Sequence, residues 1–434
     1  MLLELGSTRA LACSRPAPSP VATGAHWGLQ LVAQLQRAPV VGEGADHRTR
    51  GACAPHLIRM DTAKAGTTNR SVQAGQHTSH RPPAPLEYSL MKIGVIGCGA
   101  LGSYYGAMLA RAGAEVHFLT RSDYVVVRDR GVRIISPSGD FEVRPICARR
   151  PEEISHCDLV LIGLKTTANH EFARLVPPLA GPQSLVLTLQ NGLGNEEALA
   201  KVVDAKRVLG GLCFVCLNRV APGVIRHSGY GHVLLGEFGR PPHPRTHELA
   251  ALFVRSGVKC SVVQNIEEAH WEKLVWNIPF NGLGTASAVG YDSIVLGRVL
   301  EGSPRQPCRT TDQLLDNGPW EQLVCELMSE VIRTARAIGF GLGAPVAAKQ
   351  VERTRSMGAY KASTLIDFEN AKPLEMEAMF LNPLRQARAC GVETPRLAAL
   401  CSVLESIDPG RGSSERDANT GPGTAARDET SHVG

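Results

Sequence analysis

Three glycines near residue 100 have the spacing of a phosphate-binding turn, Gly97-Cys98-Gly99-Ala100-Leu101-Gly102. An apolar run over 93–96 precedes them, a helical pattern follows to Arg111, and a second apolar run covers 116–119. A G-x-G-x-x-G match requires this strand–turn–helix–strand context. The first glycine then permits a tight turn, the second lets backbone approach a pyrophosphate, and the third lets helix and strand pack closely. The amides that open the helix bind phosphates. The alternative is a glycine-rich turn in another α/β fold.

The residues after the second predicted strand indicate which dinucleotide binds. An NAD-specific site needs an acidic residue there for the ribose hydroxyls, whereas this chain has Arg121 between Thr120 and Ser122. A cation flanked by two hydroxyls suits a 2′-phosphate. We therefore expect NADPH or NADP as the cofactor. The alternative is that Arg121 is a solvated surface charge.

Two more polar residues follow predicted strands. Lys165 ends the apolar run over 158–164, and Asn191 follows the run over 185–189. Ligands of a doubly wound sheet bind beyond the carboxyl ends of its strands. We expect Lys165 to approach the cofactor and Asn191 to approach the nicotinamide or the substrate. The sequence leaves open that Lys165 is a surface lysine and that Asn191-Gly192 is only a turn.

A narrow polar stripe marks a largely apolar helix predicted to begin near residue 263. Lys273, Asn277 and Asn281 span about 80° of the helix circumference at about 100° per residue. Buried polar groups need partners, and Asn is a poor helix former, so the stripe suggests a cleft. A solvated stripe or polar helix packing explains the periodicity equally well. Pro279 is expected to kink the helix, which makes the position of Asn281 less defined than that of Asn277.

Glu375 is the acidic candidate of the C-terminal region. Pro373 suits the first turn of a helix, so Glu375 would lie near the positive end of the helix dipole and remain ionised. On the sequence alone, favourable capping electrostatics explain this carboxylate as a structural feature.

These residues belong to two regions of different pattern. Strands alternating with helices over 91–262 predict a Rossmann-type doubly wound parallel sheet. A hairpin is expected where 132–135 and 141–143 flank Pro137-Ser138-Gly139-Asp140. The 3.6-residue period over 263–408 predicts an all-helical domain with an inserted surface loop at about 295–309.

The two ends of the chain lack sustained periodicity. Residues 1–90 are rich in Ala, Gly, Pro, Ser, Thr and Arg, which favours a disordered extension before Met91, with an organellar targeting segment as the alternative. Residues 409–434 are expected to be a disordered tail.

Composition excludes several classes of protein. The net charge of +5 is not gathered into a basic tract, which fits an anionic small molecule and argues against nucleic acid. No apolar run reaches the length of a membrane span. The 12 cysteines form no regular framework, which indicates a reduced, cytoplasmic protein, or an organellar one if residues 1–90 are a transit peptide. Cys213 and Cys216 form a CxxC pair in a predicted strand, where they should point to opposite faces as core thiols. We expect no metal site.

Taken together, the motifs resemble those of the ketopantoate reductase family over about 92–404, interrupted by the loop near 295–309. The matching parts are the glycine turn with Arg121, Leu164-Lys165, Asn191-Gly192, the stripe of Lys273, Asn277 and Asn281, and Ser363 with Glu375 twelve residues later. Each part is weak alone, but the order and spacing are specific to the family.

The resemblance implies a Rossmann domain, a helical domain similar to that of 6-phosphogluconate dehydrogenase, and an active site between them. It implies that Lys273 is the general acid, and that Glu375 binds the substrate hydroxyl and helps to fix Lys273. Asn277, Asn281 and Ser363 would hold the substrate, and Asn191 would lie near the nicotinamide. The implied reaction is NADPH-dependent reduction of 2-dehydropantoate, a 2-oxo acid, to pantoate in pantothenate and coenzyme A biosynthesis.

The chemistry implied for Lys273 is physically consistent. Negative charge builds on the carbonyl oxygen during hydride transfer, and a nearby ammonium can stabilise that charge and donate its proton. Tyr360 departs from the family pattern, where Asn is frequent, and this departure leaves the exact substrate open. The alternatives are a reductase of another 2-oxo acid or amino-linked acid, and a non-catalytic NADPH-binding regulatory protein. A homodimer is also left open.

Overall fold

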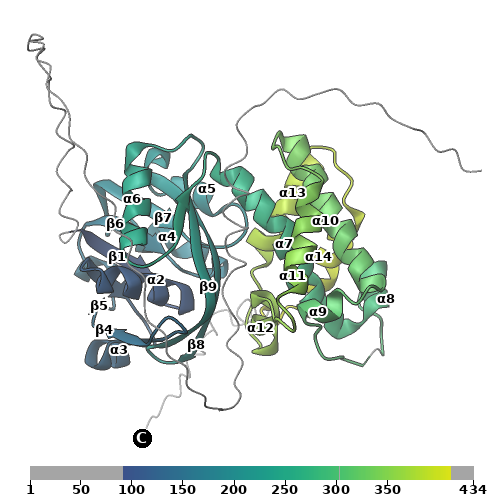
Figure 1. The fold of residues 1–434 in the computed structure, drawn as a ribbon, viewed down its shortest axis with the longest axis horizontal. Coiled ribbons are helices and arrows are strands. Elements are labelled where there is room, and N and C mark those ends of the chain that lie inside the picture. Colours follow the sequence, from purple (N-terminus) through teal and green to yellow (C-terminus); the bar gives the residue numbers. More distant parts are fainter. Residues whose placement is uncertain (1–90, 303, 412–434) are drawn as a thin grey trace, which may run out of the picture. The chain divides into compact units, whose positions relative to one another are not determined.

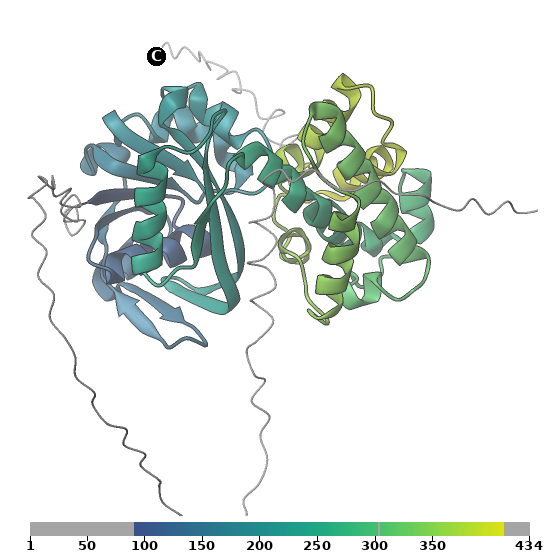
Figure 2. The ribbon, with the colours of Figure 1, turned by 45° about the horizontal axis from the view of Figure 1, so that its top comes forward.

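The protein is described by a computed structural model that covers residues 91–302 and 304–411. These residues belong to one compact unit. The predictions for residues 1–90 and for 412–434 lie outside the described residues. Figures 1 and 2 show a sheet-containing part followed in sequence by a helical part, so the chain has a Rossmann-type α/β region and a C-terminal helical region.

The N-terminal part is built on one mixed sheet of ten strands among the described residues. In spatial order the strands are β4 (Phe141–Val143), β3 (Val132–Ile135), β9 (Val224–Glu237), β8 (Val208–Ala221), β7 (Ala180–Thr188), β6 (Cys157–Ile162), β1 (Lys92–Ile96), β2 (Glu115–Leu119) and β5 (Ile146–Ala148), and β10 (Cys260–Val262) pairs with β9. The strands from β5 to β8 are all parallel. The chain leaves β1 toward β2 and later returns to β6 on the other side of β1, so a ligand-binding crevice is expected where the strand order reverses.

Helices cover both faces of this sheet (Figure 1). On one face α2 (Ala100–Arg111) and α6 (Pro244–Arg255) pack against side chains such as Val95 and Leu161. On the other face α4 (Phe172–Leu175) and α5 (Asn195–Ala200) pack against Ile96 and Val160. Successive residues of a strand therefore serve opposite cores, because their side chains alternate between the faces. A short helix, α3 (Tyr124–Arg130), follows β2.

The prediction of the 132–135/141–143 hairpin is confirmed, since β3 and β4 pair antiparallel at these residues. The predicted doubly wound parallel arrangement is confirmed for the strands from β5 to β8, and β8 and β9 add a long antiparallel hairpin to it. The β-rich runs over 208–217 and 233–235 in the sequence predict only parts of these two strands. The register of this hairpin shifts between Phe214 and Val215 and again between Cys216 and Leu217, which interrupts the alternation on which a sequence-based prediction depends.

The helical part is organised around α7 (Ile266–Ala286). Asn265 caps its first turn by accepting hydrogen bonds from the amides of Glu267 and Glu268. The helix continues past Pro279, so the expected disturbance there does not end it. The remaining elements are α8 (Tyr291–Leu296), α9 (Thr311–Leu314), α10 (Pro319–Ile338), α11 (Pro345–Arg355), α12 (Ser363–Glu369), a π-helix (Glu377–Leu381), α13 (Asn382–Ala389) and α14 (Pro395–Ile407).

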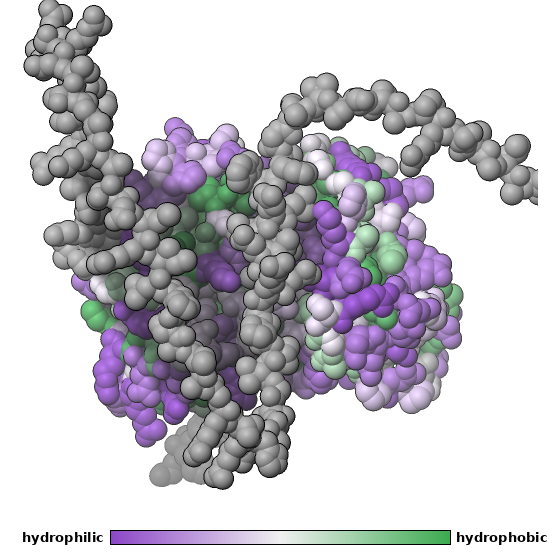
Figure 3. Space-filling model, in the orientation of Figure 1, coloured by the Kyte–Doolittle hydropathy of each residue, from purple (hydrophilic) through white to green (hydrophobic). Residues whose placement is uncertain are grey.

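The predicted loop at 295–309 lies between α8 and α9, although Val295 and Leu296 still belong to α8. On the face shown in Figure 3, hydrophilic residues dominate the visible surface of both parts, and apolar ones form small separate areas. No helix in the described ranges is long and apolar enough to cross a membrane.

Candidate active site

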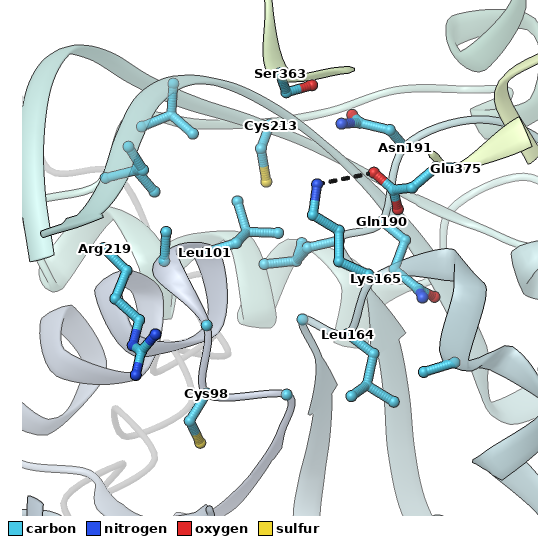
Figure 4. Close-up of a pocket in the computed structure, with 18 of the residues that line it drawn as sticks. Cys98, Leu101, Leu164, Lys165, Gln190, Asn191, Cys213, Arg219, Ser363 and Glu375 are labelled. Atoms are coloured by element: carbon cyan, nitrogen blue, oxygen red, sulfur yellow. Dashed lines mark hydrogen bonds and ion pairs between the residues drawn. The ribbon is translucent and has the colours of Figure 1, made fainter. Parts of the chain in front are cut away.

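A cavity of about 710 Å³ joins the carboxyl ends of the central strands to α7 and neighbouring segments. Every residue predicted for the site lines it except Gly102, which lies one turn into α2 behind the glycine turn. Figure 4 shows Lys165, Asn191, Cys213, Ser363 and Glu375 directed toward the same space. The crevice expected from the strand order is therefore the cavity in which the predicted residues meet.

The glycine turn has the backbone geometry of a phosphate-binding turn. Gly97 has a φ of 93°, which favours glycine. A Cβ on Gly102 would clash with the carbonyl oxygen of Gly97, whereas the space beside Gly99 is open. No side chain caps the first amides of α2, which begins at Ala100. Free amides next to an open position fit a pyrophosphate.

The end of β2 has unpaired groups that fit the 2′-phosphate of NADPH. The guanidinium of Arg121 makes no hydrogen bond or ion pair with any described residue, while the neighbouring Glu171 carboxylate is paired with Arg174. The buried hydroxyl of Thr120 also lacks a partner in the described part of the chain. Arg149, which the sequence reasoning did not select, lines the same end of the cavity and lies over the Tyr124 ring at 4.5 Å.

Replacing Arg121 with Ala should weaken NADPH binding about 30-fold, since a hydrogen bond to a charged group contributes about 1.5–3 kcal/mol. NADH affinity should change less than about twofold, because NADH has no 2′-phosphate. Fluorescence titration of both nucleotides measures this difference. Arg130→Ala removes an exposed charge of α3 outside the cavity and serves as the control. Equal weakening for both nucleotides would remove Arg121 from 2′-phosphate recognition.

Lys273 extends from α7 toward the sheet. Its Nζ donates to Oδ1 of Asn191 at 2.7 Å and to the carbonyl oxygen of Cys213 at 2.9 Å. An ammonium has three N–H donors, so one donor remains for a ligand in the cavity. Burial lowers the pKa of Lys273 to about 8, against the opposing effects of Cys213 and the Glu375 carboxylate. This amine can therefore give up a proton near neutral pH.

Glu375 makes no hydrogen bond or ion pair with Lys273, which the family resemblance implied it helps to fix, but its charge raises the pKa of this lysine. Its carboxylate accepts from Nζ of Lys165 at 3.1 Å and from the backbone amide of Thr166 at 2.8 Å. Lys165 also forms an ion pair with Asp367 at 2.7 Å. Burial opposes the charge on Lys165, but the two carboxylates outweigh it and raise the pKa of Lys165 above its usual value. Lys165, predicted to approach the cofactor, thus joins the strand end of β6 to the segments that carry Asp367 and Glu375.

The two asparagines of the stripe differ in their bonding. The side-chain oxygen of Asn281 accepts from the backbone amide of Thr364 at 3.0 Å and from the hydroxyl of Ser363 at 3.3 Å. Asn277 lines the cavity, is 5% exposed, and has no hydrogen bond from its amide group to any described residue. The amide of Asn277 is therefore available to a ligand, while Asn281 helps to position Ser363. Pro279 does not move Asn281 away from the cavity.

Sequence reasoning missed the wall formed by β8 and the helical part. Phe214 and Trp276 line the cavity, and so does Tyr360, which the sequence analysis named only as a departure from the family pattern. Cys213 and Cys216 were expected on opposite faces of one strand, but both line the cavity as free cysteines, because the register of β8 shifts between them. Aromatic residues in a strand normally indicate core packing, so periodicity alone gave no signal for this wall.

Comparison with known proteins agrees with this geometry. The chain matches the family models "Ketopantoate reductase PanE/ApbA" over residues 93–240 and "Ketopantoate reductase PanE/ApbA C terminal" over residues 307–408. It is 36% identical over 323 residues to a 2-dehydropantoate 2-reductase of Nostoc sp., covering 73% of this chain and 95% of the relative. It is 30% identical to that of Halobacterium salinarum, covering 72% and 98%.

Solved structures give the same result. The crystal structure of 2-dehydropantoate 2-reductase from Geobacter metallireducens is similar with a TM-score of 0.66 and 41% identity, covering 73% of this chain and 99% of the other. The enzyme from Methylococcus capsulatus is similar with a TM-score of 0.64 and 31% identity, covering 76% and 99%. Together with the two family models, these relatives show that the chain belongs to the ketopantoate reductase family.

Proposed function

We propose that this protein catalyses the NADPH-dependent reduction of 2-dehydropantoate to pantoate, a step of pantothenate and coenzyme A biosynthesis. The observation that carries the proposal is the ammonium of Lys273, which has one unused donor in the cavity that contains the glycine turn. The names of the relatives support the substrate.

The cofactor would be held by the amides of the glycine turn and by Arg121. Bound NADPH supplies a hydride to the carbonyl carbon. Lys273 stabilises the negative charge that develops on the ketone oxygen and donates a proton to that oxygen. Asn191 and the Cys213 carbonyl direct the ammonium by accepting two of its three N–H groups. Asn277 supplies neutral donors that fix the substrate, and Ser363, whose hydroxyl donates to Asn281, offers its oxygen as an acceptor.

Glu375 keeps in this proposal the role of binding the substrate hydroxyl that the resemblance implied, but it does not fix Lys273 through a hydrogen bond. Its carboxylate is engaged by Lys165 and by the Thr166 amide, so it binds the substrate hydroxyl with its remaining lone pairs. It influences Lys273 through its charge and not through a hydrogen bond. The pair of Lys165 and Glu375 also links the end of β6 to the segment after α12.

The direct test is NADPH consumption with 2-dehydropantoate, compared with NADH and with a panel of small 2-oxo acids. The proposal expects the largest kcat/KM for the NADPH and 2-dehydropantoate pair. A higher kcat/KM for another 2-oxo acid would identify that acid as the substrate. Tight NADPH binding without oxidation by any acid of the panel would favour a non-catalytic, NADPH-binding regulatory protein.

The rate of reduction should depend on the protonation of Lys273. Below pH 8 the amine is mainly protonated, so kcat should be nearly independent of pH. Above the pKa of about 8 the acid form is lost, and kcat should fall about tenfold per pH unit. Pantoate oxidation should show the opposite dependence, because that direction needs the neutral amine. Steady-state rates of reduction and of pantoate oxidation from pH 6 to 10 measure both dependences. A rate of reduction that rises across this range would contradict the role of Lys273.

A cytoplasmic location and a homodimer are further predictions of this proposal. Cell fractionation tests the location, and sedimentation of the purified protein tests the oligomeric state.

A further inference from the structure

One cation at the substrate end of the cavity has no counter-ion. Arg353 of α11 lines the cavity and is half-buried. Its guanidinium makes no hydrogen bond or ion pair with any described residue. Its contacts are with rings, since its Cζ lies 5.7 Å from the centroid of Phe214 and 5.6 Å from that of Tyr230. Burying an unpaired guanidinium even partly costs free energy unless a ligand pairs with it.

The hairpin backbone is shaped to hold this guanidinium. Tyr230 has a φ of 64°, in the left-handed region that a bulky residue rarely adopts. The hairpin register shifts beside it, between Phe214 and Val215, and such bulges redirect side chains next to active sites. Nε2–H of the buried His227 donates to the carbonyl oxygen of Tyr230 at 3.0 Å and stabilises this conformation. Local strain of this kind persists where it serves a site.

Contact with two rings restricts the guanidinium without using its donors. Cation–π contacts use none of the N–H groups of the guanidinium, and these groups lie on the edge of its plane. That edge is the part that binds a carboxylate through two parallel hydrogen bonds. Arg353 is therefore oriented by Phe214 and Tyr230 before any ligand arrives, which reduces the entropy lost on binding.

Lys273 and Arg353 share one ring. Nζ of Lys273 lies 5.3 Å from the centroid of Phe214, the ring that Arg353 also contacts. No carboxylate of the described residues pairs with either cation. In a 2-oxo acid the carboxylate is bonded directly to the ketone carbon, so two cationic groups in contact with the same ring can serve its two oxygen-bearing groups.

We infer that Arg353 binds the carboxylate of the substrate and makes the site selective for 2-oxo acids over neutral ketones. This inference rests on the proposed function for the identity of the ketone, and it assigns the ketone oxygen to Lys273 and the carboxylate to Arg353. Arg353 contacts substrate in the ground state and in the transition state alike, so it should affect KM more than kcat.

The test combines a protein variant with a ligand variant. In the enzyme–NADPH complex, Arg353→Gln should raise the Kd of oxamate, an unreactive 2-oxo acid analogue, by about 100-fold. The Kd of methyl oxamate, which lacks the negative charge, should change less than about twofold. The KM for 2-dehydropantoate should rise with the oxamate Kd, while kcat falls less than about threefold. Quenching of NADPH fluorescence measures binding without turnover.

Two controls separate recognition from structure. Lys349→Gln removes one positive charge from the exposed side of the same helix, away from the cavity, and should leave both ligands unaffected. Arg353→Lys should recover part of the oxamate affinity, because it restores the charge but not the two-donor geometry. Thermal unfolding midpoints establish that each variant folds.

Several results would overturn the inference. These are equal weakening of oxamate and methyl oxamate by Arg353→Gln, no weakening of oxamate, and a wild-type complex that does not prefer oxamate to its ester. Failure of the proposed function looks different: the wild-type protein would reduce none of the 2-oxo acids, while oxamate would still bind more weakly to Arg353→Gln.

Discussion

Replacing Lys273 with Ala is expected to lower kcat about 10³-fold and to leave the Kd of NADPH within about twofold. General acid catalysis contributes about 10²–10⁴-fold, and this variant removes both the proton and the charge that stabilise the ketone oxygen. The glycine turn and Arg121 are unchanged, so cofactor affinity should persist. Single-turnover rates of NADPH oxidation and a fluorescence titration provide the two measurements.

The stability of the Lys273 variant gives an independent check. Because burial lowers the pKa of Lys273 to about 8, the folded protein releases a proton there that the unfolded chain keeps to about pH 10.4. Between pH 8 and 10.4 the unfolded chain therefore binds one proton more than the folded protein, so the free energy of unfolding of the wild type should rise with pH in this range. Lys273→Ala should lack this rise. The variant should also not unfold more easily at pH 7, because the buried ammonium destabilises the folded wild type there. Lys349→Ala, which changes an exposed side chain, is the matched control for stability.

Unchanged turnover in Lys273→Ala would remove Lys273 from the mechanism.

Glu375→Gln should lower kcat/KM by about 100-fold, because it removes the charge of a buried carboxylate in the cavity that accepts hydrogen bonds. The variant replaces a carboxylate that accepts from Lys165 and from the Thr166 amide. A glutamine can still accept from that amide, but it cannot neutralise Lys165. The Glu375 charge also raises the pKa of Lys273, so its loss should move the decline of kcat in the pH profile to a lower pH.

This shift in the pH profile is what a merely structural role of Glu375 would not produce. Glu377→Gln is the matched control, because Glu377 lies two residues along the chain, is exposed, and pairs with Arg385 outside the cavity. A pH profile of Glu375→Gln that coincides with that of the wild type would show that the Glu375 charge does not act on Lys273. A wild-type kcat/KM in the variant would remove Glu375 from substrate binding.

Local patterns predicted much of the fold. The glycine turn, the β3–β4 hairpin and the central strands depend on residues that are close in sequence, so composition and alternation were sufficient. Prediction recovered only parts of β8 and β9, where register shifts interrupt the alternation. The helix α7 continues through Pro279, because the packing of α7 on both sides of this proline outweighs its helix-breaking tendency.

The amino-acid sequence by itself determined which groups were available for chemistry: a phosphate-binding turn, a cation after β2, a lysine and two asparagines on one helix face, and a late glutamate. Only the tertiary structure decided which of them meet. Lys273 lies 82 residues from Asn191, and Glu375 lies 210 residues from Lys165, so their pairing depends on how α7 and the segment after α12 pack against the strand ends. The lowered pKa of Lys273 and the unpaired state of Arg353 arise in the same way, because burial and the absence of a counter-ion are properties of the packed chain and not of local sequence.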